Sequence, residues 1–103
     1  MRMMVTFSFP TDSGNDFVRS GKVGEAFKNL MADIKPEAAY MYPVNGMRGG
    51  HAIINMTDSS EVASVAERFW FALKAHVTLT PVMNPEDLQK GLSDISGIVK
   101  RFG

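Results

Sequence analysis

Histidine is the side chain that gains and loses a proton near neutral pH, and this sequence contains two, His51 and His76. Proton transfer in any reaction would therefore begin with one of them, so both are catalytic candidates. Each stands at the start of a segment predicted to be a strand, and neither has a serine and an acid at a spacing that indicates a triad. The alternative for each is an ordinary histidine at the end of a strand.

Tyr40 and Tyr42 lie two residues apart, so they share one face of a predicted strand. Their rings can form the wall of an aromatic pocket and their hydroxyls can donate hydrogen bonds, although packing in a core or dimer contact is the alternative. Asn55 can donate to a ligand carbonyl or a developing oxyanion, or it can satisfy backbone near the strand end. The predicted ligand-binding side chains are Tyr40, Tyr42, His51, Asn55 and Thr78.

Metal and cofactor sites are not predicted. Zinc sites need three or four ligands, and the charge-free parts of the predicted strands supply only two histidines, while the chain has no cysteine. The predicted hairpin contains three glycines, Gly46, Gly49 and Gly50. The residues around them do not have the pattern of a phosphate-binding loop. We therefore expect no cofactor.

Alternating apolar and polar residues indicate four strands, and apolar residues at helical spacing indicate three helices. Turn residues separate the elements, with Pro10–Asn15 after the first strand and a hairpin signal, Asn45–Gly46, in a loop longer than the tightest type. Phe17 and Val18 indicate an earlier helical turn that continues into the first main helix, with a break near Ser20–Gly21. Trp70 is expected to anchor the core from the second main helix. The predicted strands span residues 2–9, 37–44, 51–56 and 75–83, and the helices span 23–34, 62–73 and 85–102.

This order predicts an α+β fold of the ferredoxin-like type, β-α-β-β-α-β, followed by a C-terminal helix. Right-handed crossovers place both main helices on one face of a four-stranded antiparallel sheet. The chain has 103 residues and a mass of 11.3 kDa. This length predicts a single domain over residues 1–103.

The distribution of charge is the most informative feature of the chain. Residues 3–11, 38–47, 49–57 and 75–85 contain no Asp, Glu, Lys or Arg, although about eight would be expected there at the chain-wide 21%. A sheet face in water normally carries such residues, so we expect a second copy of the chain to cover the helix-free face. The alternative is a small domain whose strands simply contain few charges. The face is predicted to carry Met4, Thr6, Ser8, Tyr40, Tyr42, His51, Ile53, Asn55, His76, Thr78 and Thr80.

Composition excludes several classes of protein. Eleven basic residues balance eleven acidic ones, so no overall field attracts nucleic acid or an anionic membrane. Tyr40 and Tyr42 also lack the basic neighbours in their strand that RNA-binding sheets use. No apolar run is long enough for a secretion signal or a membrane span, and the absence of cysteine excludes disulfides. We expect a soluble, cytoplasmic protein.

The element order and three stretches of sequence resemble the dimeric α/β-barrel superfamily over roughly residues 1–90, and most closely a group of short bacterial proteins of unknown function. The resemblance implies that two ferredoxin-like sheets pair face to face, with ligands between sheet and helices or inside the barrel. Members include cofactor-independent monooxygenases of aromatic substrates, lactone isomerases, haem-degrading enzymes and proteins without known activity. The stretches are Met4-Val5-Thr6-Phe7-Ser8-Phe9, Gly49-Gly50-His51-Ala52-Ile53-Ile54 and Val77-Thr78-Leu79-Thr80-Pro81-Val82-Met83.

The resemblance does not imply that this chain degrades haem, because one of the residues that haem-degrading members use is missing. Haem-degrading members use a tryptophan on the second helix and a histidine shortly after it, which Trp70 and His76 match. They also use an asparagine on the first strand, where this chain has Thr6 and Ser8.

Three functions therefore stand as hypotheses. The first is a homodimeric protein that binds a small apolar or aromatic molecule. The second is a cofactor-independent monooxygenase or isomerase with His51 or His76 as its base, and the third is a purely structural dimer. The sequence leaves open whether the last helix packs on its own subunit or reaches across to the partner.

Overall fold

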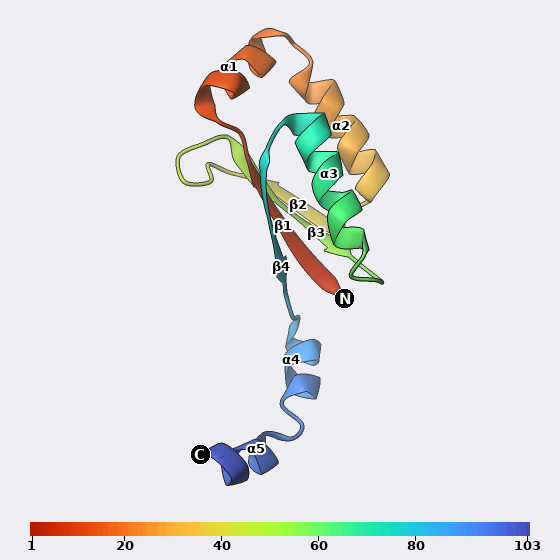
Figure 1. The fold of residues 1–103 in the computed structure, drawn as a ribbon, viewed down its shortest axis with the longest axis vertical. Helices are drawn as coiled ribbons and strands as arrows, with labels where there is room; N and C mark the ends of the chain where they lie inside the picture. Colours follow the sequence, from red (N-terminus) through yellow and green to blue (C-terminus); the bar gives the residue numbers. More distant parts are fainter.

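The computed structural model describes residues 1–103 and has an α+β fold with one four-stranded antiparallel sheet and five helices (Figure 1). The sheet order β2-β3-β1-β4 is compatible with the ferredoxin-like class that the sequence predicts. No helix is long and apolar enough to cross a membrane. The elements are β1 (Arg2–Ser8), α1 (Thr11–Arg19), α2 (Val23–Ile34), β2 (Ala38–Met41), β3 (Gly49–Asn55), α3 (Glu61–Leu73), β4 (His76–Pro81), α4 (Pro85–Gly91) and α5 (Ile95–Phe102).

Strand β1 lies in the centre of the sheet between β3 and β4. Its side chains alternate between the two faces, and Met3, Val5 and Phe7 are buried on the face that α2 and α3 cover. Phe7 packs against Phe69 of α3 and Phe27 of α2, with ring centroids 5.4 Å and 6.1 Å apart. Both main helices therefore lie on the same face, and the other face carries no helix (Figure 1).

The segment after β1 is a helix, so the prediction of a turn over Pro10–Asn15 is wrong. Pro10 fixes the entry to α1, and its carbonyl accepts a hydrogen bond from the Gly14 amide. Arg48 from the β2–β3 loop donates to the Asn15 Oδ1 at 2.8 Å. Tertiary contacts of this kind override the weak helix propensity of the segment. The predicted break near Ser20–Gly21 is confirmed, with Gly21 at a φ of 73° between α1 and α2.

Strand β2 is shorter than predicted and ends at Met41. Asn45 and Gly46 both have positive φ and form a two-residue turn between the bridged residues Val44 and Met47. This turn lies within a β2–β3 loop, residues 42–48, that is longer than the tightest type, as the sequence predicts. Pro43 has no amide hydrogen to continue the ladder between this turn and β2.

Two predictions about the helices are also wrong. The last helix is divided into α4 and α5, because the turn-forming residues Ser93 and Asp94 follow Gly91 and no packing restores a continuous helix there. Trp70 is 48% exposed and does not anchor the core. The buried stripe of α3 is made by Val65, Ala66, Phe69 and Leu73, which leaves Trp70 at its edge.

Close backbone approach makes two glycines of β3 necessary. A Cβ added to Gly50 would overlap with the Tyr40 carbonyl oxygen, and one added to Gly49 would overlap with that of Phe7. Both obstacles are backbone atoms of paired strands, which cannot move without breaking the ladder.

We predict that Gly50→Ala destabilises the protein by about 1–3 kcal/mol, the usual cost of overpacking. The matched control is Gly24→Ala in α2, where an added Cβ meets nothing within 4 Å. The control should stabilise the fold by about 0.5–1 kcal/mol, because alanine is the better helix former. Chemical denaturation measures both values, and equal effects of the two substitutions would contradict this account of β3.

The start of α3 depends on two carboxylates. Glu61 Oε2 accepts hydrogen bonds from the amides of Thr57 (2.7 Å) and Asp58 (3.2 Å), and these bonds lower the pKa of Glu61. The amide of Ser60 donates to Asp58 Oδ1 and lowers the pKa of Asp58. Each lowered pKa means that the ionised carboxylate favours the folded state above the pKa of the unfolded chain.

We therefore predict that Glu61→Gln lowers the melting temperature at pH 7, and that the difference from the wild type shrinks as the pH falls below about 4. The wild type loses this contribution there because its own carboxylate becomes protonated. Glu67→Gln on the same helix is the control, since Glu67 makes no such bonds. Thermal unfolding at pH 7 and pH 3 is the measurement, and a difference that persists at pH 3 would contradict the assignment.

Candidate functional site: the helix-free face of the sheet

The strand register places the residues predicted for the helix-free face of β1, β3 and β4 on one side of the sheet. In the middle of this face, one side chain from each of the four strands forms a row. From β4 to β2, the row consists of Thr78, Thr6, His51 and Tyr40. A second row contains Thr80, Met4, Ile53 and Ala38. Neither row contains a charged residue.

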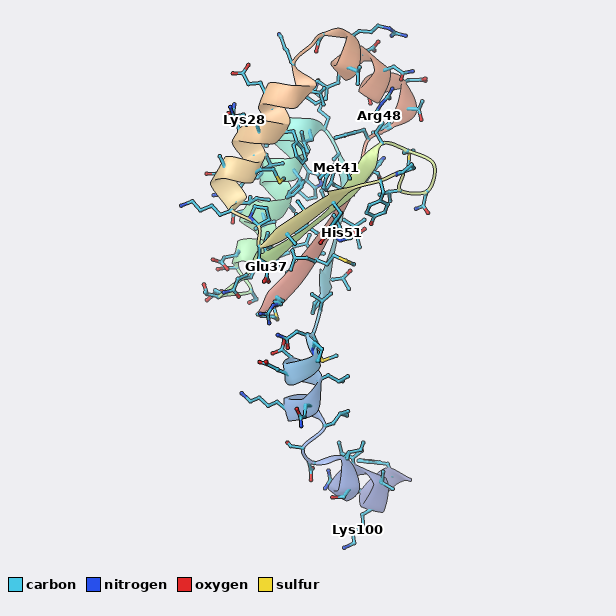
Figure 2. All side chains as sticks on the ribbon, turned by 180° about the vertical axis from the view of Figure 1, so that it is seen from behind. Lys28, Glu37, Met41, Arg48, His51 and Lys100 are labelled. Atoms are coloured by element: carbon cyan, nitrogen blue, oxygen red, sulfur yellow. The ribbon has the colours of Figure 1, made fainter.

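His51 is the centre of an aromatic group with the two tyrosines of the β2 segment. Its Nδ1 lies 3.0 Å from the Tyr42 hydroxyl oxygen, at hydrogen-bond distance. The His51 ring centroid is 5.4 Å from that of Tyr42 and 5.5 Å from that of Tyr40. We call Tyr40, His51 and Tyr42 the Tyr–His cluster. Figure 2 shows His51 on the sheet, away from the helix layer that carries Lys28.

The cluster presents one nitrogen of an oriented imidazole. The Tyr42 contact occupies Nδ1 and fixes the ring plane, which leaves Nε2 free for a ligand or a substrate proton. Tyr40 is 61% exposed and offers an aromatic surface beside it. The cluster can therefore hold a flat apolar molecule and make a hydrogen bond or a proton transfer at its edge.

The other predicted residues lie at different places on this face. Thr78 is in the same row as His51, on the far edge strand, with Thr6 between them. Asn55 is four residues along β3 from His51, a separation of about 13 Å by the rise of a strand. Its Oδ1 accepts a hydrogen bond from the amino group of Met1.

His76 lies apart from the cluster as well. It pairs with Ser8 at the opposite end of the sheet from Asn55 and is two strands from His51. The structure thus brings together Tyr40, Tyr42 and His51, and it separates Asn55 and His76 from them.

Charge on the helix-free face is confined to one end. Arg2 at the start of β1 donates to Glu37 Oε1 at 3.0 Å and to Asp87 Oδ2 of α4 at 3.2 Å. Both ion pairs are exposed, so each contributes at most about 1 kcal/mol. No group of three or more histidine and acidic side chains lies close enough to hold a metal ion.

A cavity of about 510 Å³ lies on the helix side, between α1, the start of α2 and the end of α3, and sequence reasoning missed it. Phe9, Phe17, Phe71 and Leu73 give it an apolar wall, and Lys22 and Lys74 lie at its border. None of the predicted site residues lines it. Its one sequence signal is Phe71, an aromatic residue that lies outside the apolar stripe of its helix and is 84% exposed.

No protein-family model and no curated protein matches this sequence. The resemblance to the dimeric α/β-barrel superfamily therefore stays a prediction.

We predict that Tyr42→Phe frees the His51 ring while leaving the fold intact, at a cost in stability of about 1 kcal/mol, the net contribution of one hydrogen bond. The imidazole nitrogen chemical shifts of His51 should change, because Nδ1 loses its partner. Tyr40→Phe is the matched control, since the Tyr40 contact with His51 is through the rings. Equal shift changes in both variants would contradict the contact between Tyr42 and Nδ1.

Proposed function

We propose that the chain is a homodimeric small-molecule-binding protein of the α/β-barrel type, in which the helix-free sheet faces of two copies lie against each other. The ligand lies between these faces at the Tyr–His cluster. The observation that carries the proposal is the pair of uncharged rows across all four strands, with an oriented histidine between two tyrosines.

The chemistry of the face supports this assembly. Met4 and Ile53 are only half-buried in one chain and lie side by side in the second row. Threonines on β1 and β4 supply hydroxyls that can either donate or accept a hydrogen bond. Because the rows contain no charged residue, two such faces can meet without burying an unpaired charge. A dimer contact also removes water from the Tyr–His cluster, which strengthens its hydrogen bond to a ligand.

The ligand class follows from the same groups. Aromatic rings favour a small apolar or aromatic molecule, and the free Nε2 of His51 favours a hydroxyl or carbonyl oxygen on it. Thr78 of the same row can supply a further hydroxyl contact at the other edge of the sheet.

One observation favours a second candidate, a cofactor-independent monooxygenase or isomerase. The Tyr42 hydroxyl orients His51, which is the arrangement a general base needs. In this case Nε2 of His51 removes a proton from the substrate, and His76, which is exposed and lies apart from the cluster, has no part in the reaction. Oxygen uptake, or conversion of a lactone, that His51→Gln abolishes would support the enzyme over the binding protein.

The test of the assembly is native mass spectrometry of the purified full chain, which reports the dimer and any co-purified molecule together. We predict that Thr78→Glu weakens the dimer by about a hundredfold or more, because two unpaired carboxylates would be buried between the faces. Ala63→Glu on the outer surface of α3 adds the same charge on the helix side and should leave the dimer unchanged. A dimer that tolerates both substitutions equally would overturn the sheet-face assembly.

Binding is tested separately from assembly. The Tyr42→Phe and His51→Gln variants should remain dimeric and lose the co-purified molecule, or lose affinity for an added aromatic probe such as naphthol. A dimer with no bound molecule and no affinity for naphthol would favour the purely structural dimer.

A further inference from the structure

Residues 83–102, which we call the arm, leave the sheet at the end of β4 and extend away from the rest of the molecule (Figure 1). Helices α4 and α5 contain no buried residue. Figure 2 shows the same separation from the opposite side, with Lys100 far from the sheet. The ion pair between Arg2 and Asp87 joins the start of the arm to the sheet.

The arm has the pattern of a packed element. Its start is specified by a capping box between Asn84 and Asp87, with Pro85 at the first helical turn. In each helix of the arm, large apolar side chains recur at helical spacing, and we call these side chains the apolar stripe. Each of them is at least 39% exposed. The apolar side chains are Leu88, Leu92, Ile95, Ile98, Val99 and Phe102.

Helix length shows that this arm needs a partner. Helix α4 has 7 residues and helix α5 has 8 residues. Isolated helices shorter than about 12 residues are marginal in water. Their own chain supplies no packing beyond the junction with β4. The single chain therefore leaves the apolar stripe uncovered.

The exposed area indicates how large this contact is. A compact chain of this mass should expose about 5700 Å². This chain exposes 7164 Å². The excess is about 1400 Å², and two copies that each cover the excess of the other would bury about 2800 Å², within the range of obligate homodimers.

The shape of the chain agrees with this excess. Its radius of gyration is 17.2 Å. A compact domain of this length has a radius of gyration of about 13 Å. The arm accounts for the difference, because it is the segment that extends beyond the sheet and its helices (Figure 1).

From these observations we infer that the arm is exchanged between two copies of this chain, so that its apolar stripe packs on the partner and the contact is made twice about a two-fold axis. A second copy is the occupant because the excess area of two chains matches what an obligate homodimer buries, and symmetric homodimers are the commonest oligomers. The stripe itself contains no charge, so its burial brings no unpaired ion into the interface. This inference shares the homodimer with the proposed function but does not depend on the ligand or on the sheet faces meeting.

The first measurement is the mass and shape of the full chain in solution, by light scattering and small-angle X-ray scattering. We expect twice the chain mass. One chain mass with a radius of gyration of about 13 Å would show that the arm folds back on its own sheet. One chain mass with the 17.2 Å of the extended chain would show an arm without a partner. Either result overturns the inference.

The second measurement compares Ile95→Glu with Ser96→Glu. The two neighbours gain the same charge, and neither is buried in the single chain, so both variants should keep the helical circular dichroism of the body. Ile95→Glu should raise the dimer dissociation constant at least about tenfold, because it places a charge in the buried stripe. Equal dissociation constants for the two variants would overturn the inference.

The third measurement places the arm directly. A dimer assembled from one isotope-labelled and one unlabelled copy should give intermolecular nuclear Overhauser effects from the Ile95 and Ile98 methyl groups. Their absence in a stable dimer would overturn the exchange. If Ile95→Glu separates the copies and Thr78→Glu does not, the arm exchange stands and the sheet-face assembly of the proposed function fails. The opposite result would keep the sheet-face assembly and overturn the exchange.

Discussion

A sheet has two faces, and in this chain the helices cover one of them. The alternation of β1 dictates this division, because Val5 and Phe7 point into the core with Phe69 while Met4 and Thr6 point to the other side. Burial of Phe7 and Phe69, each essentially inaccessible to water, supplies much of the free energy that holds α2 and α3 on the sheet. The helix-free face takes no part in that core, so core packing does not constrain which residues it carries, and it is available for another contact.

The sequence predicts this arrangement well where the periodic signal and the tertiary contacts agree. The alternation in β1, β3 and β4 is strong enough to place His51, Thr6 and Thr78 on one face. Apolar residues recur at helical spacing from Val23 to Ile34, and the structure confirms a helix, α2, over the same residues. Because side chains alternate strictly between the two faces of a strand, the residues of one sheet face can be predicted from the sequence alone.

Elements held by contacts distant in sequence are not predictable in this way. The first part of helix α1, residues 11–16, consists of residues typical of turns, and only its end at Phe17 and Val18 carries a helical signal. The helix forms because Phe17 packs edge-on against Phe9 and Asn15 binds Arg48 from a loop far along the chain. Trp70 follows the spacing of the core stripe but lies at its border, where a helix turn of about 3.6 residues leaves it facing water. The site is likewise only partly predictable. Residue spacing shows that Tyr42 and His51 lie on the same face of the sheet, but it does not show that the Tyr42 hydroxyl contacts Nδ1 of His51.

The arm is joined to the sheet at Arg2, and exposed ion pairs make up part of this junction. Two exposed ion pairs hold Arg2 to Glu37 and Asp87. Dissolved salt screens such pairs over about 8 Å at physiological ionic strength. Attraction of this strength can bias the direction in which α4 leaves the sheet, but it is too weak to lock that direction. The angle between the arm and the sheet therefore depends partly on the exposed ion pair between Arg2 and Asp87. This angle should change with ionic strength whenever no apolar contact holds α5 in place.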